Sequence, residues 1–80
     1  MNKEEEMQAI QKVMQVFEDK LGIKNYQDSS SLKDLGLDSL DVVEVLLEVE
    51  KMFDIKFTGE DRPETIKDLK NLILSKLAKK

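Results

Sequence analysis

Ser39 opens a run of helix-spaced apolar residues within the string LGLDSLDVVE, and four carboxylates surround it in sequence, at Asp34, Asp38, Asp41 and Glu44. A serine hydroxyl becomes a nucleophile when a neighbouring base activates it. The chain contains neither histidine nor cysteine, so the usual bases and thiols of covalent catalysis are missing. The pattern therefore predicts a hydroxyl that another enzyme modifies, in a protein that is not itself an enzyme.

The composition limits the class of protein further. The 80 residues are 40% hydrophobic and 38% charged, which predicts one small domain over residues 1–80, built on a single core. Without cysteine there is no disulfide framework, sulfur chemistry would need an attached cofactor, and a cytoplasmic location is expected. The acidic start MNKEEEMQAI does not resemble a secretory signal, and no apolar run has the length of a membrane span. No acidic cluster has the spacing of a metal site, so no metal is expected.

The net charge of −4 is distributed unevenly along the chain. Residues 38–54 contain six acidic residues and one lysine, whereas residues 55–80 contain seven basic and four acidic residues. An acidic segment repels phosphate backbones and attracts basic protein surfaces. The sequence therefore predicts protein partners and no nucleic acid.

The elements that position Ser39 can be read from the spacing of apolar residues. A recurrence at intervals of three and four predicts an amphipathic helix over Lys3–Leu21, which Gly22 ends in a left-handed conformation. Both Met7 and Met14 are expected in its core face. Residues 23–38 lack a sustained period and predict a long first loop, attached to the core by three leucines, Leu32, Leu35 and Leu37.

A second helix is predicted from Asp38, as N-cap, to about Phe53. At 100° per residue, its apolar side chains separate into two ridges. One ridge is a core face composed of Val42, Val45, Leu46, Val49 and Phe53. The other ridge contains Leu40, Val43 and Leu47 and is flanked by Glu44, Glu48 and Glu50. This second ridge is either covered by the first loop or forms a small docking strip rimmed by acids.

A final helix is predicted after Thr65, which forms a capping-box pattern with Asp68. Its apolar residues are Ile66, Leu69, Leu72, Ile73 and Leu77. The connector over residues 54–64 contains Gly59 and Pro63, so any helix there is a turn or two at most. The expected fold is all-α: a small bundle of three main helices plus a short third helix or turn and a long first loop.

The stretch DLGLDSLDVVEVLLEVEKMFDIKF resembles the signature of acyl carrier proteins, in which the triplet DSL marks the attachment serine. The resemblance extends over most of the chain, because the predicted helices and loops follow in the family's order. It implies that Ser39 carries 4′-phosphopantetheine, installed from coenzyme A as a phosphodiester by a separate transferase. The terminal thiol of that arm would hold acyl groups as thioesters, and a cavity lined by Leu46, Val49 and the last helix would lodge the acyl chain.

The resemblance also implies a docking surface on the second helix. The positions that match the family's partner-facing residues are Asp38, Leu40, Asp41, Val43, Glu44, Leu47 and Glu50. The implied partners are a phosphopantetheinyl transferase (holo-acyl-carrier-protein synthase), acyltransferases, ketosynthases and other synthase enzymes with basic patches. Association through a few exposed ion pairs would be fast and reversible, and the carrier is expected to be a monomer.

Two departures from the family pattern favour a specialised carrier over one of bulk fatty-acid synthesis. Lys51 and Met52 occupy positions that are usually acidic in the fatty-acid carriers, and the connector TGEDRPET looks shorter than usual. Two alternatives to an acyl carrier of fatty-acid or related type II (polyketide or specialised lipid) synthesis remain. One is an aminoacyl or peptidyl carrier, and the other is an unmodified helical interaction module with the same fold.

Overall fold

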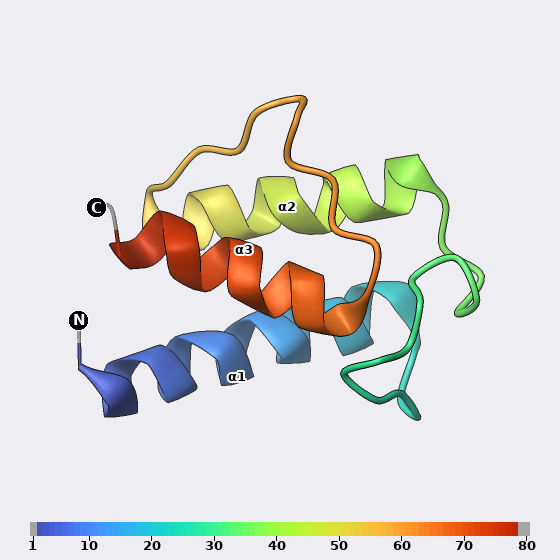
Figure 1. The fold of residues 1–80 in the computed structure, drawn as a ribbon, viewed down its shortest axis with the longest axis horizontal. Coiled ribbons are helices and arrows are strands. Elements are labelled where there is room, and N and C mark those ends of the chain that lie inside the picture. Colours follow the sequence, from blue (N-terminus) through green and yellow to red (C-terminus); the bar gives the residue numbers. More distant parts are fainter. Residues whose placement is uncertain (1, 79–80) are drawn as a thin grey trace.

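The computed structural model describes residues 2–78, and within that range the fold is all-α, as the sequence predicts. Its helices are α1 (Lys3–Leu21), α2 (Ser39–Phe53) and α3 (Ile66–Ala78). Helix α1 packs against both other helices. Helices α2 and α3 run in the same direction, opposite to α1, so the connector between them must return along the whole length of the bundle (Figure 1).

The bounds of α1 follow from its two caps. The Asn2 side chain accepts a hydrogen bond from the Glu5 N–H at 2.8 Å, which satisfies one of the free donors of the first turn. Gly22 ends the helix with φ +70°, a conformation that glycine adopts without strain, and its N–H donates to the Glu18 carbonyl. The predicted helix Lys3–Leu21 and the predicted stop at Gly22 are both confirmed.

The core lies where the three helices, the first loop and the start of the connector meet. Its buried side chains are Ala9, Val13, Met14, Phe17, Leu32, Val45, Leu46, Val49, Ile55, Ile66, Leu69, Ile73 and Leu77. The prediction that Met7 belongs to this core is wrong, because its side chain is 60% exposed. Met7 lies about 90° around α1 from the centre of the buried face, at 100° per residue.

The first loop is attached to the start of α3 by backbone hydrogen bonds. Ser31 and Thr65 form an isolated antiparallel bridge, in which the Leu32 N–H donates to the Glu64 carbonyl at 2.9 Å and the Ile66 N–H to the Ser30 carbonyl at 3.0 Å. These bonds were not predicted, because single bridging residues leave no periodic signal in a sequence. They fix the loop that leads into α2.

Tyr26 attaches the first loop to α1. Its ring packs edge-on against Phe17, with the centroids 5.6 Å apart, and its hydroxyl donates to the Glu18 carboxylate at 3.2 Å. Burial and the neighbouring Glu18 charge raise the pKa of Tyr26 to about 12, since both disfavour the phenolate. The loop is therefore held at two places, by α1 near its start and by the start of α3 near its middle.

Candidate functional site

A tight turn delivers the chain to Ser39. The Leu35 N–H donates to the Ser31 carbonyl at 3.1 Å and the Gly36 N–H to the Lys33 carbonyl at 3.0 Å, which forms a single helical turn. Gly36 ends that turn with φ +84°, a value that favours glycine. The chain then extends through Leu37, whose side chain is half-buried, and enters α2.

Asp38 caps α2 and so makes Ser39 the first residue of the helix. The Asp38 carboxylate accepts from the Asp41 N–H at 3.0 Å, and the Asp41 carboxylate accepts in return from the Asp38 N–H at 3.3 Å. This reciprocal pair is a capping box. The predicted N-cap is confirmed, whereas the second role of Asp41 was missed, because its sequence signature normally has Glu or Gln at this position.

The Ser39 hydroxyl is exposed and makes no hydrogen bond with another residue of the described range. Backbone N–H groups in the first turn of a helix lack intrahelical partners and carry partial positive charge. An anion attached to Ser39 would lie close to this helix end, with the Asp38 and Asp41 carboxylates opposing it. The chain has no histidine, and within residues 2–78 no lysine donates a hydrogen bond to the hydroxyl, so these residues present the group without activating it.

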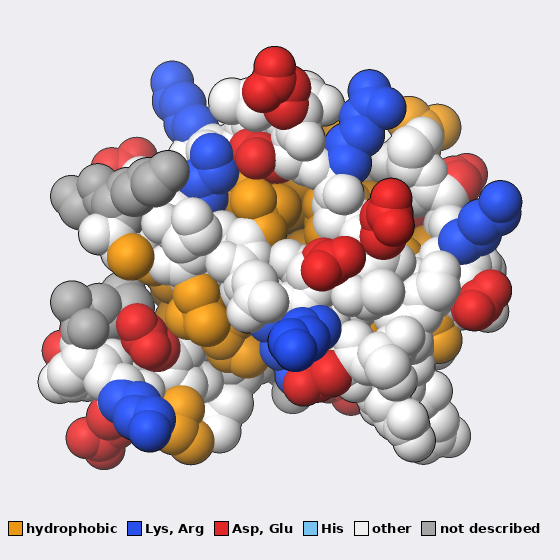
Figure 2. All heavy atoms as spheres, in the orientation of Figure 1, with side chains coloured by type: hydrophobic (Ala, Val, Ile, Leu, Met, Phe, Trp, Pro, Cys, Tyr) orange, Lys and Arg blue, Asp and Glu red, His pale blue; other side chains and the backbone are white. Residues whose placement is uncertain are grey.

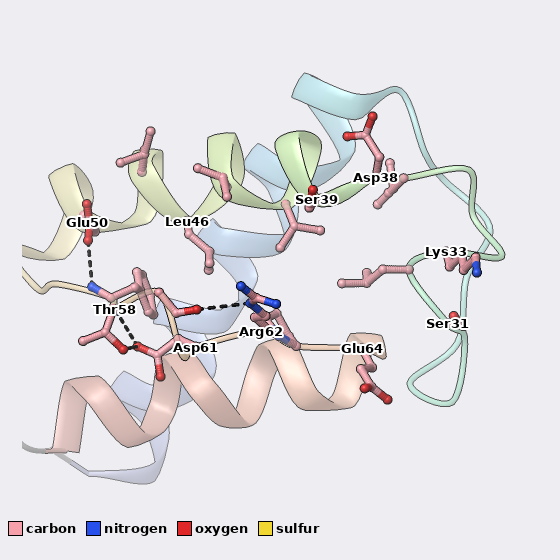
Figure 3. Close-up of a pocket in the computed structure, with 18 residues that line it drawn as sticks. Ser31, Lys33, Asp38, Ser39, Leu46, Glu50, Thr58, Asp61, Arg62 and Glu64 are labelled. Carbon is pink, nitrogen blue, oxygen red and sulfur yellow. Dashed lines mark hydrogen bonds between the residues drawn. The ribbon is translucent and has the colours of Figure 1, made fainter.

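A cleft of about 1020 Å³ begins beside Ser39 and continues under the connector. Figure 3 shows Ser39 and Leu46 on α2 along one side, Lys33 on the first loop, and Arg62 on the connector with its guanidinium directed into the space between them. The Arg62 Nε donates to the Gly59 carbonyl at 3.2 Å. Figure 2 shows apolar side chains at the surface inside the arch of the connector, with charged side chains around them.

This open cleft is not the cavity that the family resemblance implies between the helices, which would have to open within the bundle and stays a prediction. Leu46 lines the cleft, whereas Val49 and the residues of α3 within the described range do not. Val49 instead packs into the closed core with no exposed surface. The second wall comes from the connector, whose lining residues lie between 57 and 64. Figure 1 shows the connector returning along α2, which brings it to this position.

Two carboxylates hold the connector in place. The Glu50 Oε2 atom on α2 accepts from the Phe57 N–H at 2.7 Å (Figure 3). Asp61 accepts from the Thr58 N–H at 2.7 Å and pairs with the Lys76 Nζ on α3 at 3.1 Å. The Thr58 N–H and then Lys76 lower the pKa of Asp61, because both stabilise its charged form. The predicted short third helix or turn is a turn here, closed by the Asp61 N–H on the Thr58 carbonyl.

The second apolar ridge of α2 lies in solvent. Leu40 is 72% exposed, Val43 47% and Leu47 49%, so the first loop does not bury this ridge. Glu44, also exposed, lies beside it. Together these residues form what we call the α2 strip, defined as Leu40, Val43, Glu44 and Leu47.

The acids around the α2 strip have different surroundings. Glu48 pairs with Lys20 of α1 at 3.7 Å, and Glu50 is half-buried on the Phe57 N–H. Glu44 makes no ion pair or hydrogen bond with another residue of the part that the structure describes. Sequence spacing placed all three acids on one helix but could not distinguish the paired carboxylates from the free one.

A displayed serine at a capped helix start, beside an apolar cleft, is the arrangement expected of a site for a tethered cofactor. Residues 11–73 match the family described as "Phosphopantetheine attachment site". An acyl carrier protein of Amoebophilus asiaticus (strain 5a2) is 39% identical over 66 residues, which covers 79% of this chain and 81% of that relative. The chain belongs to the acyl carrier protein family.

Membership of this family defines the function at its coarse level. The protein is a non-catalytic carrier of acyl groups, its cofactor is phosphopantetheine, and it interacts with a modifying transferase and with synthase enzymes. The exposed hydroxyl, the first-turn N–H groups and the adjacent cleft fit such an arm. Over residues 2–78, no helix is long and apolar enough to cross a membrane, and no acidic cluster could hold a metal ion.

Proposed function

We propose that Ser39 is the attachment residue for phosphopantetheine and that the arm presents acyl thioesters to the enzymes of a fatty-acid or related type II pathway, of polyketide or specialised lipid synthesis. The observation that carries this proposal is the exposed, unpartnered Ser39 hydroxyl on the first turn of α2, at the mouth of the cleft. When bound, phosphopantetheine supplies a flexible tether and a thiol for the thioester. The rigid bundle supplies a fixed point of attachment.

Attachment of the arm to Ser39 does not require a base from this chain. A bond forms between Ser39 Oγ and the phosphorus of the pantetheine phosphate of coenzyme A. The pyrophosphate bond breaks, and adenosine 3′,5′-bisphosphate leaves, while a base of the transferase takes the hydroxyl proton. Ser39 can approach a transferase because the capping box directs the side chains of Asp38 and Asp41 onto the helix backbone.

The α2 strip, with Asp38, Asp41 and Glu50 at its margins, is the surface on which we expect partners to dock. Exposed leucines next to a free carboxylate suit a transient contact, since apolar contact adds affinity and exposed charge adds speed. Glu50 is a weaker candidate than the sequence indicates, because its carboxylate already holds the connector. We also expect a monomeric carrier in the cytoplasm, and the cysteine-free sequence supports that compartment.

Intact-mass analysis after incubation with coenzyme A and a phosphopantetheinyl transferase tests the proposal. The wild-type protein should gain the mass of one arm, and Ser39→Ala should gain none. Ser31→Ala is the matched control, because Ser31 lines the same cleft and leaves Ser39 untouched. It should be loaded like wild type.

The outcomes separate the alternatives. Loading of Ser39→Ala would move the attachment site elsewhere and refute the assignment. A wild-type mass that stays unchanged, with a transferase that loads another carrier, would favour the unmodified interaction module. Among loaded proteins, acceptance of an acyl group but not of an aminoacyl group would distinguish an acyl carrier from a peptidyl carrier.

A further inference from the structure

Lys51 lies on the α2 strip's side of the helix, about one turn beyond Leu47. At 100° per residue, Leu40, Leu47 and Lys51 lie within a sector of about 40°, and Glu44 lies at its edge. The Lys51 side chain is exposed and makes no ion pair with an acid of residues 2–78. The same exposed stripe therefore carries a free anion and a free cation.

The other acids from the N-cap to the last turn of α2 are engaged within the molecule. Asp38 and Asp41 cap the helix, Glu48 pairs with Lys20, and Glu50 accepts from the connector. Asp54, the exposed C-cap residue, follows the last turn and makes no ion pair within residues 2–78. A carboxylate that already accepts a hydrogen bond or faces a lysine offers less charge to a partner. The free charges on the stripe are thus Glu44 toward Ser39 and Lys51 toward the far end of the helix.

We propose that the partner enzymes of this carrier present a mixed-charge docking patch, with a cation facing Glu44 and a carboxylate facing Lys51. The two positions are seven residues apart, or about 10 Å along the helix. Leu47 lies between them and would enter an apolar contact. The inference rests on the proposed docking role of α2 and adds the sign of charge expected at each end.

Such a pattern would make docking selective. A partner patch composed of basic residues alone would match Glu44 but meet Lys51 with like charge, which opposes association. A carboxylate in the partner at that point would convert repulsion into attraction. The carrier would in this way avoid enzymes built for uniformly acidic carriers.

A charge-swap experiment with a loading enzyme tests the proposal. The first probe is a phosphopantetheinyl transferase whose docking patch contains basic residues only, with loading measured as kcat/KM at low ionic strength. Lys51→Glu should be loaded about threefold faster than wild type, and Lys51→Gln should fall between them. Lys12→Glu on the exposed face of α1 makes the same change of net charge and should stay within about 1.5-fold of wild type, because it lies off the docking stripe.

The second probe is the same transferase with each basic residue of its patch changed in turn to Glu. For the residue that faces Lys51, the preference should reverse, so that wild type is loaded faster than Lys51→Glu. Equal changes for both proteins across the whole series would overturn the proposal, as would an effect of Lys12→Glu equal to that of Lys51→Glu. Failure of wild type to gain an arm would instead refute the proposed function, so the two failures are distinguishable.

Thermal stability of each variant completes the test. Lys51 lies in the last turn of α2, where a cation also suits the helix dipole. A purely structural role would change the melting temperature without changing loading. The docking role requires that the loading rates follow the charge at position 51 for variants that all remain folded.

Discussion

Leu46 and Leu47 are neighbours on α2 with opposite surroundings. The Leu46 side chain is 7% exposed and belongs to the core, whereas the Leu47 side chain is 49% exposed and lies on the α2 strip. One helix thus has an apolar face that the fold needs and an apolar ridge that the fold leaves in water. The difference indicates that α2 is shaped by two requirements, packing inside the bundle and contact outside it.

The largest expected effect is a difference in the free energy of unfolding between variants of these two leucines. Leu46→Ala should lower the free energy of unfolding by about 2–5 kcal/mol, because it removes buried methyl groups and leaves a cavity. Leu47→Ala should change it by less than about 1 kcal/mol. Urea denaturation of both variants measures the difference. Equal losses would mean that the exposed ridge is part of the core, and the distinction between the two faces would fail.

Glu44 and Glu50 provide a second matched pair. Glu50→Ala should cost about 1–2 kcal/mol, since the Phe57 N–H loses a charged acceptor in a half-buried place. Glu44→Ala should stay within about 0.5 kcal/mol, because no contact within the described residues is lost. Thermal unfolding followed by circular dichroism checks both. An unchanged stability of Glu50→Ala would mean that the Glu50 carboxylate does not hold the connector and is available for docking.

For docking to a partner enzyme, we expect Leu47 to matter more than Leu46, which is the reverse of their order for stability. Leu47→Ala should lower kcat/KM for loading by a transferase about fivefold, as expected when an exposed apolar contact of about 1 kcal/mol is removed. The matched control is Met7→Ala on α1, which removes an exposed apolar side chain far from α2 in sequence and should leave loading unchanged. A normal rate for Leu47→Ala would show that the ridge is not used by that enzyme.

The end of α2 offers a smaller, stabilising change. Asp54 ends the helix with φ +54°, a left-handed conformation that is strained for residues other than glycine. Asp54→Gly should therefore raise stability by about 0.5–1 kcal/mol. Asp54→Ala, which keeps a β-carbon at the same φ, is the control and should not stabilise. A melting temperature that is unchanged in Asp54→Gly would mean that the aspartate pays no conformational penalty.

Tyr26, in the first loop, makes the stability of the fold depend on pH. Its raised pKa of about 12 means that the fold favours the neutral phenol. The resulting stability is fully present below the unfolded pKa of about 10 and is lost as the pH rises through about 12. Because the chain has a single tyrosine and no tryptophan, tyrosinate absorbance reports this residue alone. Titration with a midpoint near 10 would show that the ring is not held against Phe17.

Local signals were sufficient for most of the fold. The periodic apolar residues and Gly22 gave the bounds of α1, and Asp38 gave the start of α2, because caps and helix periods involve residues a few positions apart. The prediction that Met7 is buried was wrong because a residue at the edge of an apolar face can point toward the core or toward solvent. The actual position of such a residue depends on what packs beside it.

Contacts between distant segments were beyond prediction from one sequence. The Ser31–Thr65 bridge and the Glu50–Phe57 hydrogen bond join segments whose pairing depends on the path of the connector. For the same reason the cleft beside Ser39 was not predicted, because its second wall is formed by the connector. Ser39 could be identified from the local sequence, because its exposed position at the start of α2 depends on the cap at the preceding residue, Asp38.

The most direct measurement is the location of the modification in protein isolated from its own cells. Digestion and tandem mass spectrometry should find phosphopantetheine on the peptide that contains Ser39, with the fragment ions placing the phosphodiester on that serine. An arm located on any other residue, or unmodified Ser39 throughout a preparation from cells with an active transferase, would contradict the assignment.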